Sequence, residues 1–321
     1  MYNKANRDEP YQRQLMAFVR NEYSFFPITI APAKRGYYGE TWRLATADRV
    51  FFLKLNYATT HAAIYQNSFP VMDHLCQHGI DFISKIVKTT DGRLFTTFDN
   101  AVLGVFEWID GENLQNQTTK IQEYQMLAKI YTIPSNGIII PKTEFSTASA
   151  KLFYQQWEML QSNFVDETDR KLTELFKQNK AKITHRAQRL RHFAARCQPD
   201  TSHFYITHGD AGGNIIQDGD RFYLVDWDDP MLAPPERDAW FCLHWDWATD
   251  AFHQALCQNA IDYQLRPERL AYYCYHMFFW YLTTQLEAYF AIGNAGGNHY
   301  QEIADYLTCW LEDNLAYADR I

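Results

Sequence analysis

The chain has 321 residues, and its 30 basic and 38 acidic residues give a net charge of −8. The charge is divided unevenly, because residues 203–321 carry 5 basic and 18 acidic residues whereas residues 1–202 carry 25 and 20. This balance argues against a chain built to coat nucleic acid. A hydrophobic content of 47% provides for a buried core and excludes wholesale disorder.

Cysteine usage and hydropathy indicate in which cellular compartment the protein is expected. The six cysteines are scattered without a CxxC pair, which argues against a zinc ribbon or a disulfide scaffold. The first ten residues have no apolar core of a secretory signal. The most apolar stretch, 270–292, contains His276, Gln285 and Glu287, so it is interpreted as a buried core helix rather than a membrane span. We expect a cytoplasmic protein that binds neither a membrane nor a nucleic acid polymer.

The first hundred residues predict a small antiparallel sheet. Runs rich in β-branched and aromatic residues mark its strands, at 42–47, 50–55, 83–89, 93–98 and 101–108. The Asp48-Arg49 pair is typical of a tight turn between the first two runs, and Asp91-Gly92 of a hairpin between the next two.

One helical insertion interrupts these strands, over residues 59–78. It is helical at least after Ser68, which is placed to cap a helix that begins at Pro70. Gly79 supplies the stop signal at the other end.

The pattern changes to helical after Asp110-Gly111, where we place a domain boundary. Helical periodicity covers the segments 118–131, 147–161, 166–197, 267–291 and 300–318.

One β segment interrupts the helical part, over residues 207–228. If Asp218-Gly219 is a two-residue hairpin loop, Gln217 opposes Asp220. The same register brings Asp226 opposite Ala211, beside the glycine-rich loop.

The residue types in this segment suit a hard cation. Asp210, Asn214 and Asp226 would offer two carboxylates and an amide oxygen, and Mg²⁺ prefers a few such ligands with phosphate and water completing its shell. A carboxylate left over can orient a hydroxyl and accept its proton. The alternative is that Asp210 and Asn214 only form turns and Asp226 only ends a strand.

The segment also resembles a known family. His208-Gly209-Asp210 with Asn214, a hairpin, and the run DWDDPMLAPPERD at 226–238 resemble the catalytic core of aminoglycoside phosphotransferases and related small-molecule kinases. The run is most similar to the spectinomycin phosphotransferase branch. The resemblance implies an α+β, two-lobed protein-kinase-like fold, with a small antiparallel β-rich N-terminal lobe and a larger, mainly helical C-terminal lobe.

On this basis the chain divides into a nucleotide-binding lobe and a helical lobe. The expected parts are a lobe at 1–109, a hinge at about 106–111, and a lobe at 112–321 that holds a catalytic loop at 207–214, a metal-binding segment at 226–228 and the acceptor site. The resemblance implies transfer of the γ-phosphoryl group of ATP, with Mg²⁺, to a hydroxyl of a small molecule. The choice between ATP and GTP stays open.

The resemblance assigns roles in the catalytic segment residue by residue. Asp210 matches the catalytic aspartate, and Asn214 and Asp226 match the Mg²⁺ ligands. Asp228 joins the metal shell or faces the substrate, and the sequence does not decide between the two. His208 is expected to brace the loop.

It also assigns a nucleotide site in the N-terminal lobe. Lys54 matches the lysine that contacts the phosphates, and Gly36 and Gly39 lie in the loop that covers them. Backbone groups of Glu107 and Ile109 would meet adenine at the hinge. The alternatives are a lysine on a solvated strand face and a buried strand end.

Three departures from the family pattern weaken the assignment, and one of them is that the loop expected to cover the phosphates is poor in glycine. Three residues separate Asp210 from Asn214, where the family usually has four. The helix after Lys54 should supply a glutamate to pair with it, yet residues 56–72 contain no acidic residue and Gln66 lies roughly at that place. A catalytically inactive, nucleotide-binding module is therefore the alternative of another class.

The acidic C-terminal region predicts the acceptor. Its carboxylates and aromatic rings suit an amino-bearing, polyhydroxylated ligand of the aminoglycoside or aminocyclitol kind, through ion pairs and cation–π contacts. The candidate substrate residues are Asp228, Asp246, Trp245 and Glu287. Choline, a sugar or a hydroxy amino acid stay open as acceptors, and the aromatics are otherwise core residues.

Overall fold

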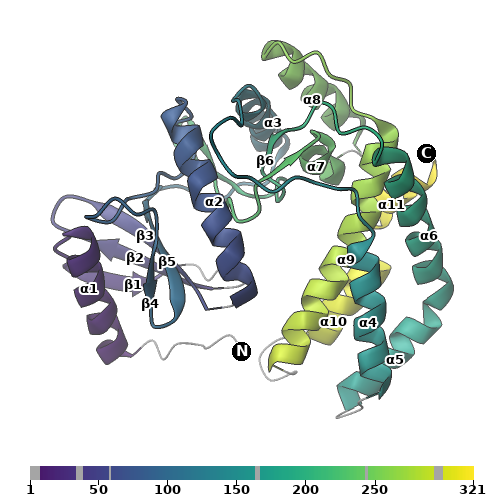
Figure 1. The fold of residues 1–321 in the computed structure, drawn as a ribbon, viewed down its shortest axis with the longest axis horizontal. Coiled ribbons are helices and arrows are strands. Elements are labelled where there is room, and N and C mark those ends of the chain that lie inside the picture. Colours follow the sequence, from purple (N-terminus) through teal and green to yellow (C-terminus); the bar gives the residue numbers. More distant parts are fainter. Residues whose placement is uncertain (1–7, 34–38, 58, 163–166, 243–244, 293–298) are drawn as a thin grey trace. The chain divides into compact units, whose positions relative to one another are not determined.

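The computed structural model describes most of the chain, as residues 8–33, 39–57, 59–162, 167–242, 245–292 and 299–321. The chain forms two compact units, each from two segments (Figure 1). The first unit contains Met1–Pro141 and His208–Met231, and the second contains Lys142–Thr207 and Leu232–Ile321. These units do not coincide with the lobes 1–109 and 112–321, and that lobe division stays a prediction.

An antiparallel sheet of five strands forms the centre of the first unit. The strands are β1 (Thr29–Pro32), β2 (Glu40–Ala45), β3 (Val50–Asn56), β4 (Thr96–Phe98) and β5 (Ala101–Glu107). Their order is β1-β2-β3-β5-β4, so the predicted strands at 42–47, 50–55 and 101–108 are confirmed. The sheet lies between helices α1 and α2 (Figure 1).

The predicted hairpin between 83–89 and 93–98 is wrong. Gly92 does form a turn, its N–H donating to the carbonyl of Thr89 at 2.9 Å. Beyond a bond from the Thr89 N–H to the Arg93 carbonyl at the turn, both flanking segments pair with β5, because Ile86 bridges to Phe106 and β4 pairs with the other end of β5. The edge of β5 that does not pair with β3 offers hydrogen-bond partners to their backbone groups, and it satisfies these groups better than an isolated hairpin would.

Helix α1 (Glu9–Tyr23) covers one face of this sheet and was not predicted. Asp8 caps it, because its carboxylate accepts from the Tyr11 N–H at 2.9 Å. The core on this face joins α1 to alternate residues of the strands, as Leu15, Val19, Tyr23, Trp42, Leu44, Phe51, Leu53, Leu55, Ala101, Leu103 and Val105. Since side chains alternate along a strand, Lys54 faces the opposite side.

Helix α2 (Thr59–Gln77) lies on that opposite side. Phe69 packs so closely on β5 that a Cβ at Gly104 would lie 2.6 Å from its Cζ. The predicted N-cap at Ser68 is wrong, because the helix runs through Pro70 and the buried Ser68 hydroxyl donates to the carbonyl of Tyr65 at 3.2 Å. The predicted end is confirmed, with Gly79 at φ +83°.

Helix α3 (Gln117–Tyr131) and a hairpin of β7 (Ile215–Asp218) and β8 (Arg221–Leu224) complete the first unit. The hairpin loop lies one residue further along the chain than predicted, because Asp218 pairs with Arg221 and the loop is Gly219-Asp220. Gln217 therefore opposes Phe222 instead of Asp220, a register shift of two positions. Gly219 has φ +57° and opens the loop, the position at which a type II′ turn takes glycine. In this register the Val225 N–H donates to the Asn214 carbonyl at 2.9 Å, so Asp226 follows opposite the end of the glycine-rich loop.

The second unit is mainly helical. Its elements are the strand β6 (Tyr205–Thr207), the strand β9 (Met231–Ala233) that starts at the unit boundary, and the helices α4 (Ala148–Ser162), α5 (Glu167–Gln178), α6 (Lys180–Cys197), α7 (Glu236–Ala239), η1 (Trp240–Cys242), α8 (Asp246–Gln258), α9 (Pro267–Ile292), α10 (His299–Thr308) and α11 (Glu312–Asp319). The predicted helices 166–197 and 300–318 are each two helices.

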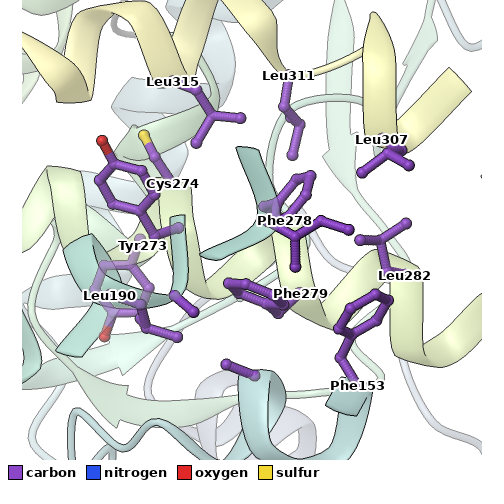
Figure 2. Packing of buried hydrophobic residues seen from close by; sticks show 14 of the residues in the cluster. Phe153, Leu190, Tyr273, Cys274, Phe278, Phe279, Leu282, Leu307, Leu311 and Leu315 are labelled. Atoms are coloured by element: carbon purple, nitrogen blue, oxygen red, sulfur yellow. The ribbon is translucent and has the colours of Figure 1, made fainter. Parts of the chain in front are cut away.

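Helix α9 is the central helix of this unit. It packs against α4, α6, α10 and α11. Figure 2 shows Phe278, Phe279 and Leu282 of α9 among Phe153 of α4 and Leu190 of α6, all fully buried. The interpretation of this apolar stretch as a core helix is confirmed, and within the described ranges no helix has the length and apolarity that a membrane crossing requires.

Candidate active site

Lys54 is the centre of a cluster of charged groups in the first unit. Strand β3 holds it between Thr41 of β2 and Gly104 of β5. Its Nζ donates to Asp226 Oδ1 at 2.6 Å and to both carboxylate oxygens of Asp228 at 2.7 Å. The side chain is only 12% exposed, which excludes a lysine on a solvated strand face.

The two carboxylates follow strand β8. Asp226 has φ +66°, and it is separated from Asp228 by Trp227, whose ring is buried and whose indole N–H donates to the Leu224 carbonyl at 3.0 Å. The anchored Trp227 thus turns away from the neighbouring aspartates, and both reach the ammonium group of Lys54.

Each charge in the cluster changes the pKa of the others. Burial lowers the pKa of Lys54, but the charges of Asp226 and Asp228 raise it further, so its pKa lies well above the ordinary value. Burial raises the pKa of Asp228 to about 6, with Lys54 opposing and Asp226 adding to the rise. For Asp226, burial raises the pKa but Lys54 outweighs it, and the net direction is down. Lys54 therefore stays charged, and Asp226 is the more acidic carboxyl.

Asp210 and Asn214 lie on the loop before β7. The Asn214 amide Nδ2 donates to the Asp210 backbone carbonyl and to Asp210 Oδ2, both at 2.9 Å. The two side chains are thus held together despite the three-residue spacing. Asp210 is exposed, so its carboxylate is accessible to a substrate.

His208 braces this loop from beneath. Its Nδ1 accepts from the Asp210 N–H at 3.2 Å, so its Nε2 carries the proton and donates to the Val225 carbonyl at 2.9 Å. The ring is fully buried, with its centroid 4.6 Å from that of Trp227. His208 therefore ties the loop to the strand that leads to Asp226.

Three side chains that sequence reasoning missed support the same loop. Glu123 of α3, fully buried, accepts from the Gly212 N–H at 2.8 Å. Asn113 and Gln115 donate to the Gly213 carbonyl at 2.7 and 2.9 Å. About a hundred residues separate each of these side chains from the glycine that it contacts, and no local sequence pattern signals such contacts.

Tyr65 of α2 also reaches the cluster and was missed. Its hydroxyl donates to Asp228 Oδ2 at 3.1 Å, and its ring centroid lies 5.2 Å from Lys54 Nζ. Gln66, which the sequence placed at the position of the family glutamate, is exposed.

The predicted nucleotide contacts are described in part. A Cβ at Gly39 would lie 2.3 Å from the Leu55 carbonyl oxygen, so glycine permits the close approach of the loop end to β3. Gly36 lies outside the described residues. Their contact with phosphates stays a prediction.

At the predicted hinge, the backbone of Glu107 is bonded within the unit. Its N–H donates to the Lys85 carbonyl and its carbonyl accepts from Ser84 Oγ, both at 2.9 Å. The N–H of Ile109 makes no hydrogen bond to any part of the chain that the structure describes. An adenine contact therefore depends on Ile109 and on the second lone pair of the Glu107 carbonyl.

The predicted acceptor residues lie on separate elements. Trp245 and Asp246 begin α8, where the Trp245 ring stacks on Trp247 at a centroid distance of 5.7 Å. Glu287 lies on α9, whose main packing partners do not include α8. Asp228 turns both oxygens toward Lys54. The acceptor roles of these residues stay predictions.

The side-chain oxygens of Asn214, Asp226 and Asp228 fit a metal site in which nucleotide phosphates supply further ligands. Within the described ranges, no three His, Cys, Asp or Glu side chains are grouped as a metal cage. Asp226 and Asp228 nevertheless converge on one cation, the Lys54 ammonium, and Asn214 lies opposite Val225 next to them. Mg²⁺ commonly needs only one or two carboxylates when nucleotide phosphates and water supply the rest.

Comparisons with known proteins agree with this geometry. The sequence model of the phosphotransferase enzyme family (APH) matches residues 29–273, which is more than half of the chain. A comparison with curated proteins finds no match.

Solved structures share the fold over nearly the whole chain. Spectinomycin phosphotransferase APH(9)-Ia, solved with ADP and spectinomycin, is 19% identical with a TM-score of 0.76, covering 96% of this chain and 97% of its own. Choline kinase from Cryptosporidium parvum Iowa II is 11% identical with a TM-score of 0.61, covering 96% of each chain. Amicoumacin kinase hAmiN, solved with AMP-PNP, Ca²⁺ and Ami, is 12% identical with a TM-score of 0.60, covering 96% and 93%. The predicted α+β, kinase-like fold is confirmed.

Proposed function

The chain belongs to the phosphotransferase enzyme family, and we propose that it transfers the γ-phosphoryl group of ATP, bound with Mg²⁺, to a hydroxyl of a small amino-bearing molecule. One observation carries this proposal. Lys54 meets Asp226 and Asp228 at 2.6–2.7 Å, while Asn214 holds the exposed Asp210 carboxylate at the end of the neighbouring loop.

The nucleotide-binding role is assigned to Lys54 and to the residues around it. Lys54 is largely buried and charged, so it would bind the nucleotide phosphates in exchange for its present partners. Asn214, Asp226 and Asp228 would hold Mg²⁺, which when bound neutralises charge on the phosphate oxygens. The Ile109 N–H would bind the purine edge.

The reaction needs positioning more than covalent chemistry. Asp210 would accept the proton of the acceptor hydroxyl as the hydroxyl oxygen attacks the γ-phosphorus in line. The bond from the γ-phosphorus to the β-phosphate oxygen would break and release ADP. The Asn214 amide donates to Asp210 Oδ2 and so fixes the orientation of the carboxylate. The hydrogen bond from His208 to the Val225 carbonyl holds the loop beside the strand that leads to Asp226.

The acceptor is proposed to carry an amino group. The net charge of −13 in residues 203–321 and the pairing of Trp245 with Asp246 at the start of α8 support it. Some solved relatives are named for spectinomycin and choline, and both molecules carry a cationic nitrogen and a hydroxyl.

A panel of acceptors tests the proposal. Purified protein with Mg²⁺ and either ATP or GTP would be offered spectinomycin, choline, homoserine and simple sugars, and phosphorylated product would be detected by mass spectrometry. Asp210→Asn should lower kcat by about 10²–10⁴-fold and leave ATP affinity nearly unchanged. Asp220→Asn, in the exposed hairpin loop, is the matched control. Unchanged turnover in Asp210→Asn would refute the catalytic assignment.

A nucleotide-binding module without catalysis is the second candidate. It is favoured by the direct pairing of Lys54 with both proposed metal ligands, which must separate before Mg²⁺ binds. A rise of the melting temperature with Mg·ATP, without ATP consumption across the acceptor panel, would support this module. Consumption that requires an acceptor would exclude it.

A further inference from the structure

Helix α2 brings no carboxylate to Lys54, although it lies on the face of the sheet to which Lys54 points. Residues 56–72 contain no acidic residue, and Gln66 is exposed. The charge of Lys54 is balanced instead by Asp226 and Asp228, which are 172 and 174 positions further along the chain. If Asp226 and Asp228 bind a metal, a side chain other than a helix carboxylate must therefore position Lys54.

We propose that Tyr65 is a positioning residue that takes the place of the absent helix carboxylate, orienting Asp228 through its hydroxyl and Lys54 through its ring. This inference rests on the proposed function, because it concerns the exchange of partners on binding Mg·nucleotide. Tyr65 is the described residue of α2 that contacts both groups.

Two contacts of different physical kind carry the inference. The hydroxyl donates to Asp228 Oδ2 at 3.1 Å, a hydrogen bond to a charged acceptor. The ring lies 5.2 Å from Lys54 Nζ, within the range of a cation–π contact. Neither contact uses an atom that the other needs, so the loss of one does not require the loss of the other.

The surroundings of Tyr65 fix it in this position. It is 3% exposed, and its ring stacks on Phe69 at a centroid distance of 5.8 Å. Burial raises its pKa, so the hydroxyl stays protonated and acts as a donor. Phe69 is in turn held against β5 at Gly104.

A neutral tyrosine has a different consequence from a glutamate. A helix glutamate would pair with Lys54 and leave Asp226 and Asp228 repelling each other until a metal arrives. Tyr65 adds no third negative charge, so without nucleotide Lys54 compensates the two aspartates. When Mg·nucleotide is bound, Asp226 and Asp228 would hold the metal and Lys54 would contact the phosphates.

The first test measures binding of AMP-PNP by calorimetry with and without Mg²⁺. Tyr65→Phe keeps the ring and removes the hydroxyl, and it should reduce the Mg²⁺-dependent gain in affinity by about tenfold. Affinity without Mg²⁺ should change less than twofold, because the ring contact with Lys54 remains. Tyr65→Leu should weaken both. Gln66→Ala, exposed and next in the chain, should change neither, and an equal loss in Gln66→Ala would overturn the inference.

The second test does not use nucleotide. In equilibrium urea unfolding, Tyr65→Phe should lower the equilibrium constant for folding by about tenfold in the wild-type chain. In the Asp228→Ala background the same change should lower this constant by less than twofold. An equal loss in both backgrounds would mean that Tyr65 only packs, and would overturn the inference. Phe69→Leu, which removes packing without touching Asp228, should lower stability equally in both backgrounds.

The two tests separate this inference from the proposed function. If the wild-type protein bound no Mg·nucleotide, the proposed function would fail while the unfolding cycle still reported the Tyr65–Asp228 contact. If nucleotide bound normally in both wild type and Tyr65→Phe, with the same Mg²⁺ dependence, the role of Tyr65 would fail and the proposed function would stand.

Discussion

The backbone N–H of Gly212 donates to Oε1 of Glu123 at 2.8 Å, across 89 positions of the sequence. This bond fixes the Gly212-Gly213 pair in the proposed catalytic loop, where three residues separate Asp210 from Asn214. The other oxygen of Glu123 accepts from Lys120 Nζ at 3.3 Å, so a buried ion pair on α3 supports the loop from below.

We expect Glu123→Ala to lower kcat by about 10–100-fold and to change the KM for ATP little, because Asp210 loses its orientation while Lys54 is untouched. Stability should fall by about 3–5 kcal/mol, since Lys120 is left buried without its partner. Glu123→Gln keeps an acceptor for Gly212 and should lose less activity. Lys129→Ala, exposed on the same helix, is the control, and wild-type kcat in Glu123→Ala would contradict the role of this contact.

His208→Ala should lower the free energy of unfolding by about 2–4 kcal/mol, measured in urea. The change removes the acceptor of the Asp210 N–H and the donor to the Val225 carbonyl, and it leaves a cavity beside Trp227. His185→Ala, on the exposed side of α6, should stay within about 0.5 kcal/mol of wild type. Equal stability of the two variants would show that the brace contributes nothing.

Gly104→Ala should destabilise the first unit by about 1–3 kcal/mol, because the new Cβ meets the Phe69 ring at 2.6 Å. In the Phe69→Leu background the same substitution should cost less than about 1 kcal/mol, since the Phe69 ring atoms are gone and the 3.0 Å contact with Phe106 Cε2 remains. Thermal unfolding of the four proteins measures the coupling. Additive losses would contradict the contact.

Burial raises the pKa of Glu236 to about 7, from an ordinary value of 4.5. This carboxyl in the second unit accepts from the Tyr263 hydroxyl at 2.9 Å and from the Arg266 N–H at 2.6 Å. Because the folded state binds the proton more tightly than the unfolded state, the stabilisation is complete below pH 4.5 and is lost as the pH rises through 7.

Glu236→Gln keeps the acceptor and removes the titration. Between pH 5 and 9 we expect the wild type to lose about 2–3 kcal/mol of stability relative to this variant, measured by urea unfolding at each pH. Asp262→Asn, exposed and near Tyr263, should follow the wild-type profile. A constant difference between wild type and Glu236→Gln would contradict a raised pKa.

The sequence predicted the parts of the fold whose signals are local. Strands β2 and β3 were predicted because a β-rich run follows a tight turn at once, and α9 was predicted from its apolar length. The errors arose where tertiary contacts decide between local alternatives. Ser68 and Pro70 resemble a helix start, but burial of Phe69 against Gly104 keeps the helix continuous through them.

The candidate site was predicted to the same extent and for the same reason. The sequence singled out Lys54, Asp226 and Asp228 one by one, because each lies in a motif with a recognisable pattern. It did not predict that Lys54 pairs with both aspartates. Tyr65 and Glu123 carry no motif, and their functional contacts reach residues 163 and 89 positions away. The hairpin register was wrong by two positions without loss of the site, because Asp226 still ends opposite the loop.

The first unit is assembled from two stretches of chain that are synthesised at different times. The ribosome releases Met1–Pro141 long before His208–Met231, so the five-stranded sheet can form while Asp226 and Asp228 do not yet exist. Until they emerge, the ammonium group of Lys54 has no carboxylate partner and must stay hydrated. Completion of this unit is therefore a late event of translation, and a nascent chain stopped before residue 208 would expose the face of the sheet that later meets Asp226 and Asp228.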